Sequence, residues 1–190
     1  MKKTVCFLLA LIAVFGSLCS YSEGDVRILS ASEYVVMWKS DPSRGMTYKV
    51  PTHWVESALG ERYKVFTEPV PAGESCFRVC FVNKKTTTDD KSTTRMKKEF
   101  NMLIEEMKAV YEDFEWDGEI SRDRQIVKFN GYASDYSYTD SNGEKMLGYV
   151  IMAKYDKRIY CMNFSGPEAR FTDDMRNIMF TILESITRST

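Results

Sequence analysis

The sequence contains a single histidine among 190 residues, and this scarcity excludes much catalytic chemistry. A Ser-His-Asp arrangement or a histidine-based metal site would have to use His53, which lies at the end of a predicted strand. No Gly-x-Ser-x-Gly, His-Glu-x-x-His, Gly-x-Gly-x-x-Gly or P-loop motif occurs in the chain. We therefore interpret His53 as a packing or loop histidine, and we predict no catalytic residue, no cofactor and no metal site.

Cysteine is also sparse. Beyond Cys6 and Cys19 near the N-terminus, the chain has Cys76, Cys80 and Cys161. Cys76 and Cys80 share one face of a predicted strand at a separation of about 13 Å, which is too far for a disulfide between them. Either could pair with Cys161 if their strands adjoin, and buried thiols are the alternative. The spacing matches no zinc site.

An excess of charge of one sign is absent. The chain has 26 basic and 27 acidic residues, a formal net charge of -1. This balance excludes the electrostatic footprint of a nucleic-acid-binding protein. The acidic runs at residues 89–90, 112–117 and 173–174 lack the alternating ligands and internal glycine of a calcium loop. We interpret them as capping and solvated charges.

Long apolar runs are absent except at the N-terminus. Lys2 and Lys3 precede an apolar stretch at residues 5–18, which is the layout of a secretory signal. About 14 residues are fewer than the roughly 20 that cross a bilayer as a helix. Ser17 and Cys19 predict cleavage after Cys19, although Cys19 could instead carry the lipid of a bacterial lipoprotein. We predict an exported protein, periplasmic or secreted, whose membrane attachment, if any, is a lipid anchor at Cys19.

The rest of the chain has an ordinary globular composition, 44% hydrophobic and 28% charged, so long disorder is not expected. No repeat of roughly 20–50 residues occurs, which excludes a solenoid or propeller. The predicted organisation is a signal peptide at residues 1–19, a polar tether at 20–32 and a single α+β domain at 33–190.

Alternating apolar residues bounded by turn formers predict many β-strands. The predicted strands are residues 34–39, 46–50, 62–68, 76–83, 124–129, 132–138, 146–155 and 158–164. Within 76–83, Phe77, Val79 and Phe81 are expected on one face. Asn142-Gly143 predicts a type I′ hairpin turn, because both residues tolerate positive φ.

Two amphipathic helices are predicted, at residues 96–114 and 171–186. The first has an apolar stripe at period 3.6, formed by Met96, Phe100, Leu103, Ile104, Met107, Val110, Tyr111 and Phe114. The second has the stripe Phe171, Met175, Ile178, Met179, Ile182, Leu183 and Ile186. Thr93 or Thr94 is the expected N-cap of the first helix and Thr172 that of the second. Each helix has one apolar face, so we predict an α+β fold in which they cover opposite faces of an antiparallel sheet.

Five segments resemble the PsbP-like family, which is named for an extrinsic subunit of photosystem II and includes many exported bacterial proteins. They are YKVPTHW at 48–54, NGYASDY at 130–136, GYVIMAK at 148–154, RIYCMNFS at 158–165 and the closing helix at 171–186. The resemblance covers residues 34–187. It implies an α-β-α sandwich with a non-enzymatic accessory or binding role, and it implies no shared active site.

Tyrosines are the candidate recognition residues. Tyr132, Tyr136 and Tyr138 share one face of a predicted strand, and tyrosine is enriched at binding surfaces. The alternative is that they fill the interface between helix and sheet. The leading functional hypothesis is a non-catalytic exported module that binds a protein or a small ligand in the cell envelope. A carboxylate-based hydrolase and a purely structural envelope protein are the alternatives.

Overall fold

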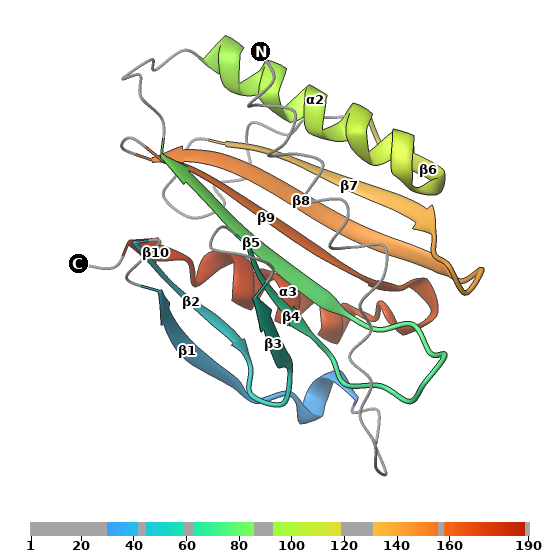
Figure 1. Cartoon of the computed structure of the whole chain (residues 1–190). Coiled ribbons are helices and arrows are strands. Elements are labelled where there is room, and N and C mark those ends of the chain that lie inside the picture. The colour runs from blue at the N-terminus through green and yellow to red at the C-terminus, as the bar shows by residue number, and fades with distance from the viewer. Residues whose placement is uncertain are drawn as a thin grey trace.

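The computed structural model describes residues 30–41, 45–58, 63–85, 93–118, 131–155 and 158–188. Within them, a large sheet lies between two helices and a smaller sheet lies beside it (Figure 1). The predicted signal peptide, residues 20–29 of the predicted tether and the predicted strand 124–129 fall outside the described residues. In the described part of the chain, no helix is both long and apolar enough to cross a membrane.

The large sheet has the strand order β3-β4-β5-β9-β8-β7-β6, and every neighbouring pair is antiparallel. Its strands are β3 (Val55–Ala58), β4 (Tyr63–Thr67), β5 (Arg78–Lys85), β6 (Glu112–Trp116), β7 (Gly131–Thr139), β8 (Lys145–Tyr155) and β9 (Arg158–Pro167). The predicted strands at 62–68, 76–83, 132–138, 146–155 and 158–164 are confirmed. The edge strands β3 and β6 were not predicted.

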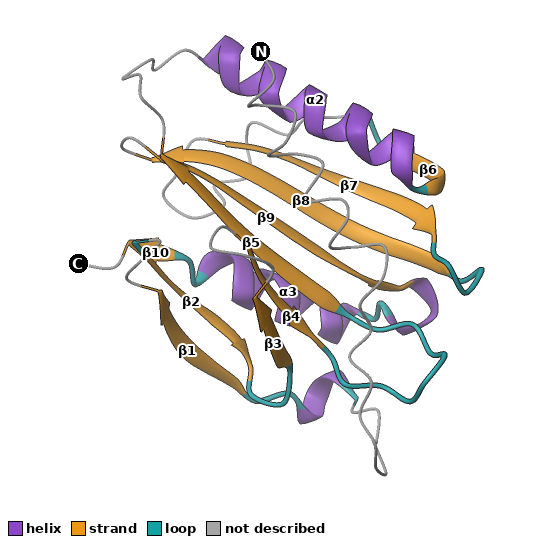
Figure 2. Ribbon diagram, in the orientation of Figure 1, coloured by secondary structure: helices purple, strands orange, loops and turns teal. Residues whose placement is uncertain are grey.

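The two long helices lie on opposite faces of this sheet, as the two apolar stripes predict (Figure 2). Helix α2 (Thr93–Val110) covers one face, where Phe100, Leu103 and Ile104 are fully buried. Helix α3 (Asp173–Glu184) covers the other face with Met175, Met179, Ile182 and Leu183. The α+β sandwich is therefore confirmed. Each helix needs the sheet because only one of its faces is apolar.

The N-terminal end of α3 is capped as predicted. The Thr172 side chain accepts a hydrogen bond from the Met175 backbone N–H at 3.3 Å, and Asp173 and Asp174 lie in the first turn. The prediction for α2 needs two corrections. The helix already includes Thr93 and Thr94, so neither is its N-cap, and it ends at Val110 rather than at residue 114.

The error at the end of α2 has a local cause. Asp113 adopts a φ of 50°, a left-handed conformation that no α-helix continues through. The chain turns there into β6, which pairs with β7 across an irregular register. Tyr111 and Phe114 still pack against the same core as the helix stripe, so the apolar period continues although the helix does not.

A second, three-stranded sheet was not predicted. It contains β1 (Val36–Asp41), β2 (Met46–Pro51) and the short β10 (Thr187–Arg188), in the order β1-β2-β10. Its inner side joins α3 over the large sheet: the Tyr48 ring stacks on Phe81 with centroids 4.1 Å apart. Phe77, Val79 and Phe81 of the large sheet share this face, as predicted.

The β7–β8 connection also differs in detail from the prediction. Strand pairing runs to Thr139 and Lys145, so the hairpin itself is confirmed. Only Gly143 has a positive φ, 76°, whereas Asn142 does not, so the turn is not type I′. The backbone N–H of Gly143 donates to the carbonyl of Asp140 at 3.0 Å, which gives a tight turn followed by a left-handed glycine.

Candidate ligand-binding cavity

Tyr132, Tyr136 and Tyr138 point from β7 toward α2 and are buried beneath it. Their rings fill the space between helix and sheet, which is the alternative that the sequence left open. They therefore share no exposed surface in this structure. Tyr138 lies near the end of the strand, however, and there it lines a cavity.

The cavity lies where α2 ends and β7 passes into the β7–β8 turn, and its volume is about 200 Å³. Its walls are Arg78 at the start of β5, residues 110–112 at the α2–β6 junction, and residues 138–141. The Tyr111 and Tyr138 rings stack with centroids 4.2 Å apart and form an aromatic wall. Such a space, partly apolar with a few converging polar groups, is typical of a small-ligand site.

The hydroxyl groups of Tyr111 and Tyr138 are buried, and neither has a hydrogen-bond partner among the described residues. Ser165 stands close enough to lower the pKa of Tyr138 slightly, but its Oγ makes no hydrogen bond of normal geometry. Leaving a buried hydroxyl unpaired costs about 1–3 kcal/mol. Both hydroxyl oxygens are themselves fully buried, so the rings of these tyrosines, and not their hydroxyls, form the cavity wall.

The neighbouring Tyr136 differs. Its hydroxyl donates a hydrogen bond to the Oδ1 of Asn163 on β9, and both side chains are buried. The hydroxyl of Tyr136 therefore has a partner, whereas those of Tyr111 and Tyr138 have none among the described residues.

Electrostatics keep both cavity tyrosines protonated. Burial raises the pKa of Tyr111 well above its ordinary value, and neighbouring tyrosines add to this, while Arg78 opposes it. Burial also raises the pKa of Tyr138, with Arg78 again the largest opposing influence. Both groups are therefore hydrogen-bond donors at neutral pH, and neither is suited to act as a base.

The rim of the cavity is fixed by Asp140. Its Oδ1 accepts hydrogen bonds from the backbone N–H groups of Asn142 at 2.9 Å and Glu144 at 3.0 Å. Its Oδ2 accepts one from the Ser75 hydroxyl at 2.5 Å. These three bonds fix the β7–β8 turn against the segment before β5, so the cavity has a preformed wall.

A second polar cluster lies on the α3 face, where the Glu68 carboxylate is the common acceptor. The Glu68 carboxylate, 1% exposed, accepts hydrogen bonds from the Tyr34 hydroxyl at 2.6 Å, the Phe77 backbone N–H at 3.2 Å and Arg170 at 2.5 Å. The His53 ring packs edge-on against Tyr34, with centroids 4.6 Å apart. Burial lowers the pKa of His53 although Glu68 opposes it, so the neutral form is favoured.

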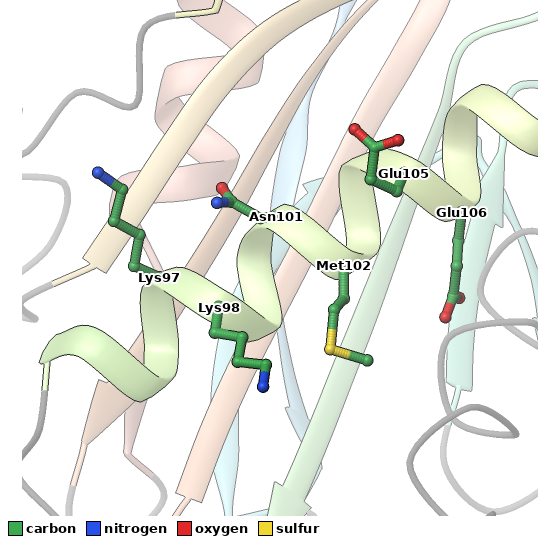
Figure 3. A pocket seen from close by; sticks show the side chains of 6 residues that line it. All are labelled: Lys97, Lys98, Asn101, Met102, Glu105 and Glu106. Carbon is green, nitrogen blue, oxygen red and sulfur yellow. The ribbon is translucent and has the colours of Figure 1, made fainter.

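A groove runs along α2 itself. Figure 3 shows Lys98, Met102 and Glu106 following one another along one side of the helix, with Lys97, Asn101 and Glu105 along another. Burial raises the pKa of Glu106. The groove is open, and the described residues that line it come from this one helix and do not converge on an enclosed point.

The thiols offer no reactive group. Cys76, Cys80 and Cys161 are all buried as reduced thiols, and Cys161 lies on β9, the strand next to β5. Burial raises the pKa of Cys161 to about 12, which keeps it protonated and unreactive. Among the described residues, no three His, Cys, Asp or Glu side chains are grouped closely enough to hold a metal ion.

The sequence analysis missed Arg78 and Tyr111. Arg78 stands in the apolar run 76–82 and is only 4% exposed, and a charged residue in such a run is the signal that could have identified it. The sequence analysis placed Tyr111 in the apolar stripe of the first helix. This correctly predicts that its ring is buried, but it says nothing about the surroundings of its hydroxyl. The grouping of these residues depends on the meeting of β5, β7 and the end of α2, which no local pattern encodes.

No protein-family model matches the sequence, and no curated protein matches it either. Solved structures do match. The cyanobacterial PsbP of Synechocystis sp. PCC 6803 aligns with a TM-score of 0.55 and 17% identity, over 88% of this chain and 97% of that chain. LpqN of Mycobacterium tuberculosis, described as involved in cell envelope biogenesis, aligns with a TM-score of 0.55 and 15% identity, over 83% and 92% of the two chains.

The Ran-binding protein Mog1p of Saccharomyces cerevisiae aligns with a TM-score of 0.56 and 8% identity, over 83% of this chain and 97% of that chain. A protein from Bacteroides thetaiotaomicron aligns with a TM-score of 0.52 and 11% identity over 80% of this chain, which spans only 48% of that protein. The shared architecture is an α-β-α sandwich. The chain has the PsbP-like fold, as the resemblance of its five segments implied.

Proposed function

We propose that this chain is an exported, non-catalytic binding module that holds a small ligand in the cavity lined by Arg78, Tyr111 and Tyr138. One observation carries the proposal: the stacked rings of Tyr111 and Tyr138 line a cavity whose wall is preformed, because the hydrogen bonds of Asp140 fix the β7–β8 turn. Tyr138 keeps its predicted recognition role in this proposal, whereas Tyr132 and Tyr136 support the wall behind it.

The chemistry of the site supports binding over catalysis. The tyrosines are protonated donors, and the guanidinium of Arg78 is permanently charged. Such groups orient a ligand, and none of the three accepts a proton at neutral pH as a general base must. The cavity also has two carboxylates, and that of Asp140 is already held by three hydrogen bonds. By analogy of fold, LpqN, described as involved in cell envelope biogenesis, supports a role in the envelope, and the Ran-binding protein Mog1p supports a protein partner.

A ligand screen tests the binding function. The full chain would be heated with a panel of small organic acids, amines, sugars and nucleosides, and its melting temperature recorded with each. At least one probe should raise the melting temperature of the wild type and fail to raise that of Ser141→Trp, whose larger side chain is introduced at the cavity wall. Asn142→Trp, at an exposed position of the same turn outside the described lining, is the matched control and should respond like the wild type. A panel without any such probe would contradict the proposal.

The mature N-terminus tests the proposed export. Intact-mass spectrometry of the chain expressed in a bacterium should find a protein that begins at Ser20, which corresponds to a signal peptide of residues 1–19. A mass that includes a diacylglyceryl group on Cys19 would indicate the lipid-anchored form instead. A chain that retains residues 1–19 in the cytoplasmic fraction would contradict export.

A further inference from the structure

Strand β1 is the outermost strand of the smaller sheet (Figure 1). In the described part of the chain it pairs only with β2, through an unbroken register from Val36↔Pro51 to Asp41↔Met46. Its other edge is therefore a row of backbone donors and acceptors that a further strand can use. Proteins commonly protect such an edge with a proline or a bulge, and residues 36–41 contain neither.

The hydrogen bonds to β2 show which backbone groups point to the free edge. The Thr52 backbone N–H donates to the Val35 carbonyl at 2.8 Å, immediately before β1. Opposite residues of an antiparallel pair alternate between those that exchange hydrogen bonds and those that do not. The odd-numbered residues of β1 therefore bond to β2, and the backbone groups of Val36, Trp38 and Ser40 point to the free edge.

Trp38 gives this edge an exposed aromatic side chain. It is 56% exposed, and the ammonium of Lys49, its partner on β2, lies 5.0 Å from the ring centroid. Both side chains lie on the outer side of the small sheet, because Tyr48 and Val50 of β2 are buried on its inner side. The edge thus combines free backbone groups with tryptophan, a residue type enriched at protein interfaces.

The charges of β1 lie on the inner side and are paired within the chain. The Lys39 ammonium lies 3.8 Å from the Glu56 carboxylate, and the buried Asp41 carboxylate lies 3.8 Å from the Lys64 ammonium. These pairs connect β1 to β3 and β4 of the large sheet. The charges of β1 are therefore balanced within the chain and present little repulsion to a strand beside it.

A second copy of β1 fits this edge in one register. Two antiparallel copies related by a twofold axis place Trp38 opposite Trp38, with Val36 opposite Ser40 on each side. All the outward residues then pair and form about six backbone hydrogen bonds, two from each pair. Sliding one strand by two residues would set Lys39 opposite Lys39, or would leave Ser40 opposite the buried Tyr34.

We propose that this chain forms a twofold-symmetric dimer in which β1 pairs antiparallel with β1 of a second copy, with Trp38 opposite Trp38. The two small sheets join into one sheet across the interface, and the two indole rings pack side by side on its outer face. The partner is a second copy because the row of outward residues is complementary to itself and sets no like charges directly opposite each other. The dimer is independent of the cavity, since none of the described residues that line the cavity lies on β1 or β2.

Sedimentation equilibrium of the full chain tests the association over about 5–500 µM, a range suited to a small interface. The wild type should show a monomer–dimer equilibrium. Ser40→Pro removes an outward N–H, and Trp38→Lys sets two positive charges opposite each other, so each should raise the dissociation constant at least about tenfold. Both positions are exposed, so both variants should fold and keep the melting temperature of the monomer. Asn101→Lys, which adds the same charge at an exposed position of α2, is the matched control and should dimerise like the wild type.

Cysteine cross-linking tests the register. Trp38→Cys sets two thiols opposite each other, and the Cα separation of about 5.5 Å in a hydrogen-bonded pair suits a disulfide. Oxidised glutathione should therefore link two copies, and mass spectrometry should locate the bond at residue 38. Ser40→Cys alone should not link through residue 40, because the two positions lie about 13 Å apart along the strands. A mixture of Ser40→Cys and Val36→Cys should link, because these positions are opposite each other.

The outcomes decide between this pairing and its alternatives. A wild type that stays monomeric up to the highest concentration would overturn the proposal. A dimer that neither Ser40→Pro nor Trp38→Lys weakens would use another surface and would also overturn it. A link through residue 40 in Ser40→Cys alone would show that Trp38 does not lie on the twofold axis, which contradicts the proposed pairing. The ligand screen uses a separate site, so none of these results affects the proposed binding function.

Discussion

The Glu68 cluster on the α3 face and the cavity on the α2 face differ in the pairing of their tyrosine hydroxyls. On the α3 face, the Glu68 carboxylate accepts hydrogen bonds from the Tyr34 hydroxyl, from Arg170 and from the backbone N–H of Phe77. On the α2 face, the hydroxyls of Tyr111 and Tyr138 remain without a hydrogen-bond partner among the described residues. A protein interior rarely leaves such groups unpaired. The comparison separates a cluster whose hydrogen bonds stabilise the α3 face from the cavity proposed to bind a ligand.

The packing of the two faces differs as well. The α3 face is covered by a helix and by a second sheet, with aromatic contacts that run from Tyr48 through Phe81 and Phe66. In the described part of the chain, one helix covers the α2 face, and the cavity lies where that helix ends.

The largest expected effect concerns Glu68. Glu68→Ala should lower the free energy of unfolding by about 3–5 kcal/mol, because it leaves Arg170, the Tyr34 hydroxyl and a buried N–H without their acceptor. Urea denaturation at neutral pH measures the change. Glu105→Ala is the control, since Glu105 is exposed and its ion pair with Lys108 should contribute less than about 1 kcal/mol. A loss for Glu68→Ala no larger than the control would show that the cluster does not hold this face together.

Two glycines test whether both faces are equally close-packed. A Cβ on Gly148 would overlap the Tyr136 ring on the α2 face, and one on Gly166 would overlap the Phe77 ring on the α3 face. Gly148→Ala and Gly166→Ala should each cost about 2 kcal/mol, because Tyr136 is held by Asn163 and Phe77 by its aromatic neighbours. Thermal and urea unfolding measure both.

Gly143→Ala is the control for the two packed glycines. Gly143 has open space around it and a φ of 76°, so its substitution should cost about 1 kcal/mol from backbone strain alone. If Gly148→Ala were cheaper than this control, the α2 face would be more loosely packed than its burial indicates.

The tyrosines sharpen the comparison within the α2 face. Tyr136→Phe should lower stability by about 1–2 kcal/mol, because it removes the hydrogen bond to the buried Asn163. Tyr138→Phe should leave the stability of the ligand-free protein unchanged or raise it by up to about 1 kcal/mol, since an unpaired buried hydroxyl is removed. Urea denaturation without added ligand distinguishes them. Equal losses for the two variants would mean that Tyr138 is a structural residue like Tyr136.

The difference between these tyrosines marks the limit of what the sequence predicts. The period of the apolar residues places Tyr136 and Tyr138 on one face of a strand and predicts that Tyr111 is buried. The structure confirms both, although Tyr111 follows the end of α2. Whether a hydroxyl finds a partner depends on residues brought from other strands, such as Asn163 on β9, opposite Val150 of β8. Periodicity contains no information about such pairings.

The same reasoning explains the errors in the fold. The apolar stripe at residues 96–114 correctly predicts which side chains are buried, but it does not predict where α2 ends. Phe114 packs against the same core from β6, so its apolar character is the same as if the helix continued. The three-stranded sheet escaped prediction because β10 has only two residues and pairs with β2 from the opposite end of the domain. Both features depend on long-range pairing rather than on local preference.

The smallest expected effect is a pH dependence on the α3 face. Burial lowers the pKa of His53, whereas the carboxylate of Glu68 opposes this shift. In the unfolded chain a histidine has a pKa of about 6.5, so below that pH the unfolded state binds a proton that the folded state accepts less readily. Stability due to His53 should therefore be present above about pH 6.5 and decline as the pH falls through that value.

His53→Gln isolates this effect because the chain has no other histidine. The free energy of unfolding would be measured from about pH 7.5 to pH 5.5, a range in which histidine is the side chain that ordinarily titrates. Glu106 acts in the opposite direction, since burial raises its carboxyl pKa, but it is unchanged in both proteins and cancels in the difference. The wild type should lose more stability on acidification than His53→Gln. Parallel curves would mean that the charge of Glu68 compensates fully for the burial of His53, and that the α3 cluster tolerates a second cation beside Arg170.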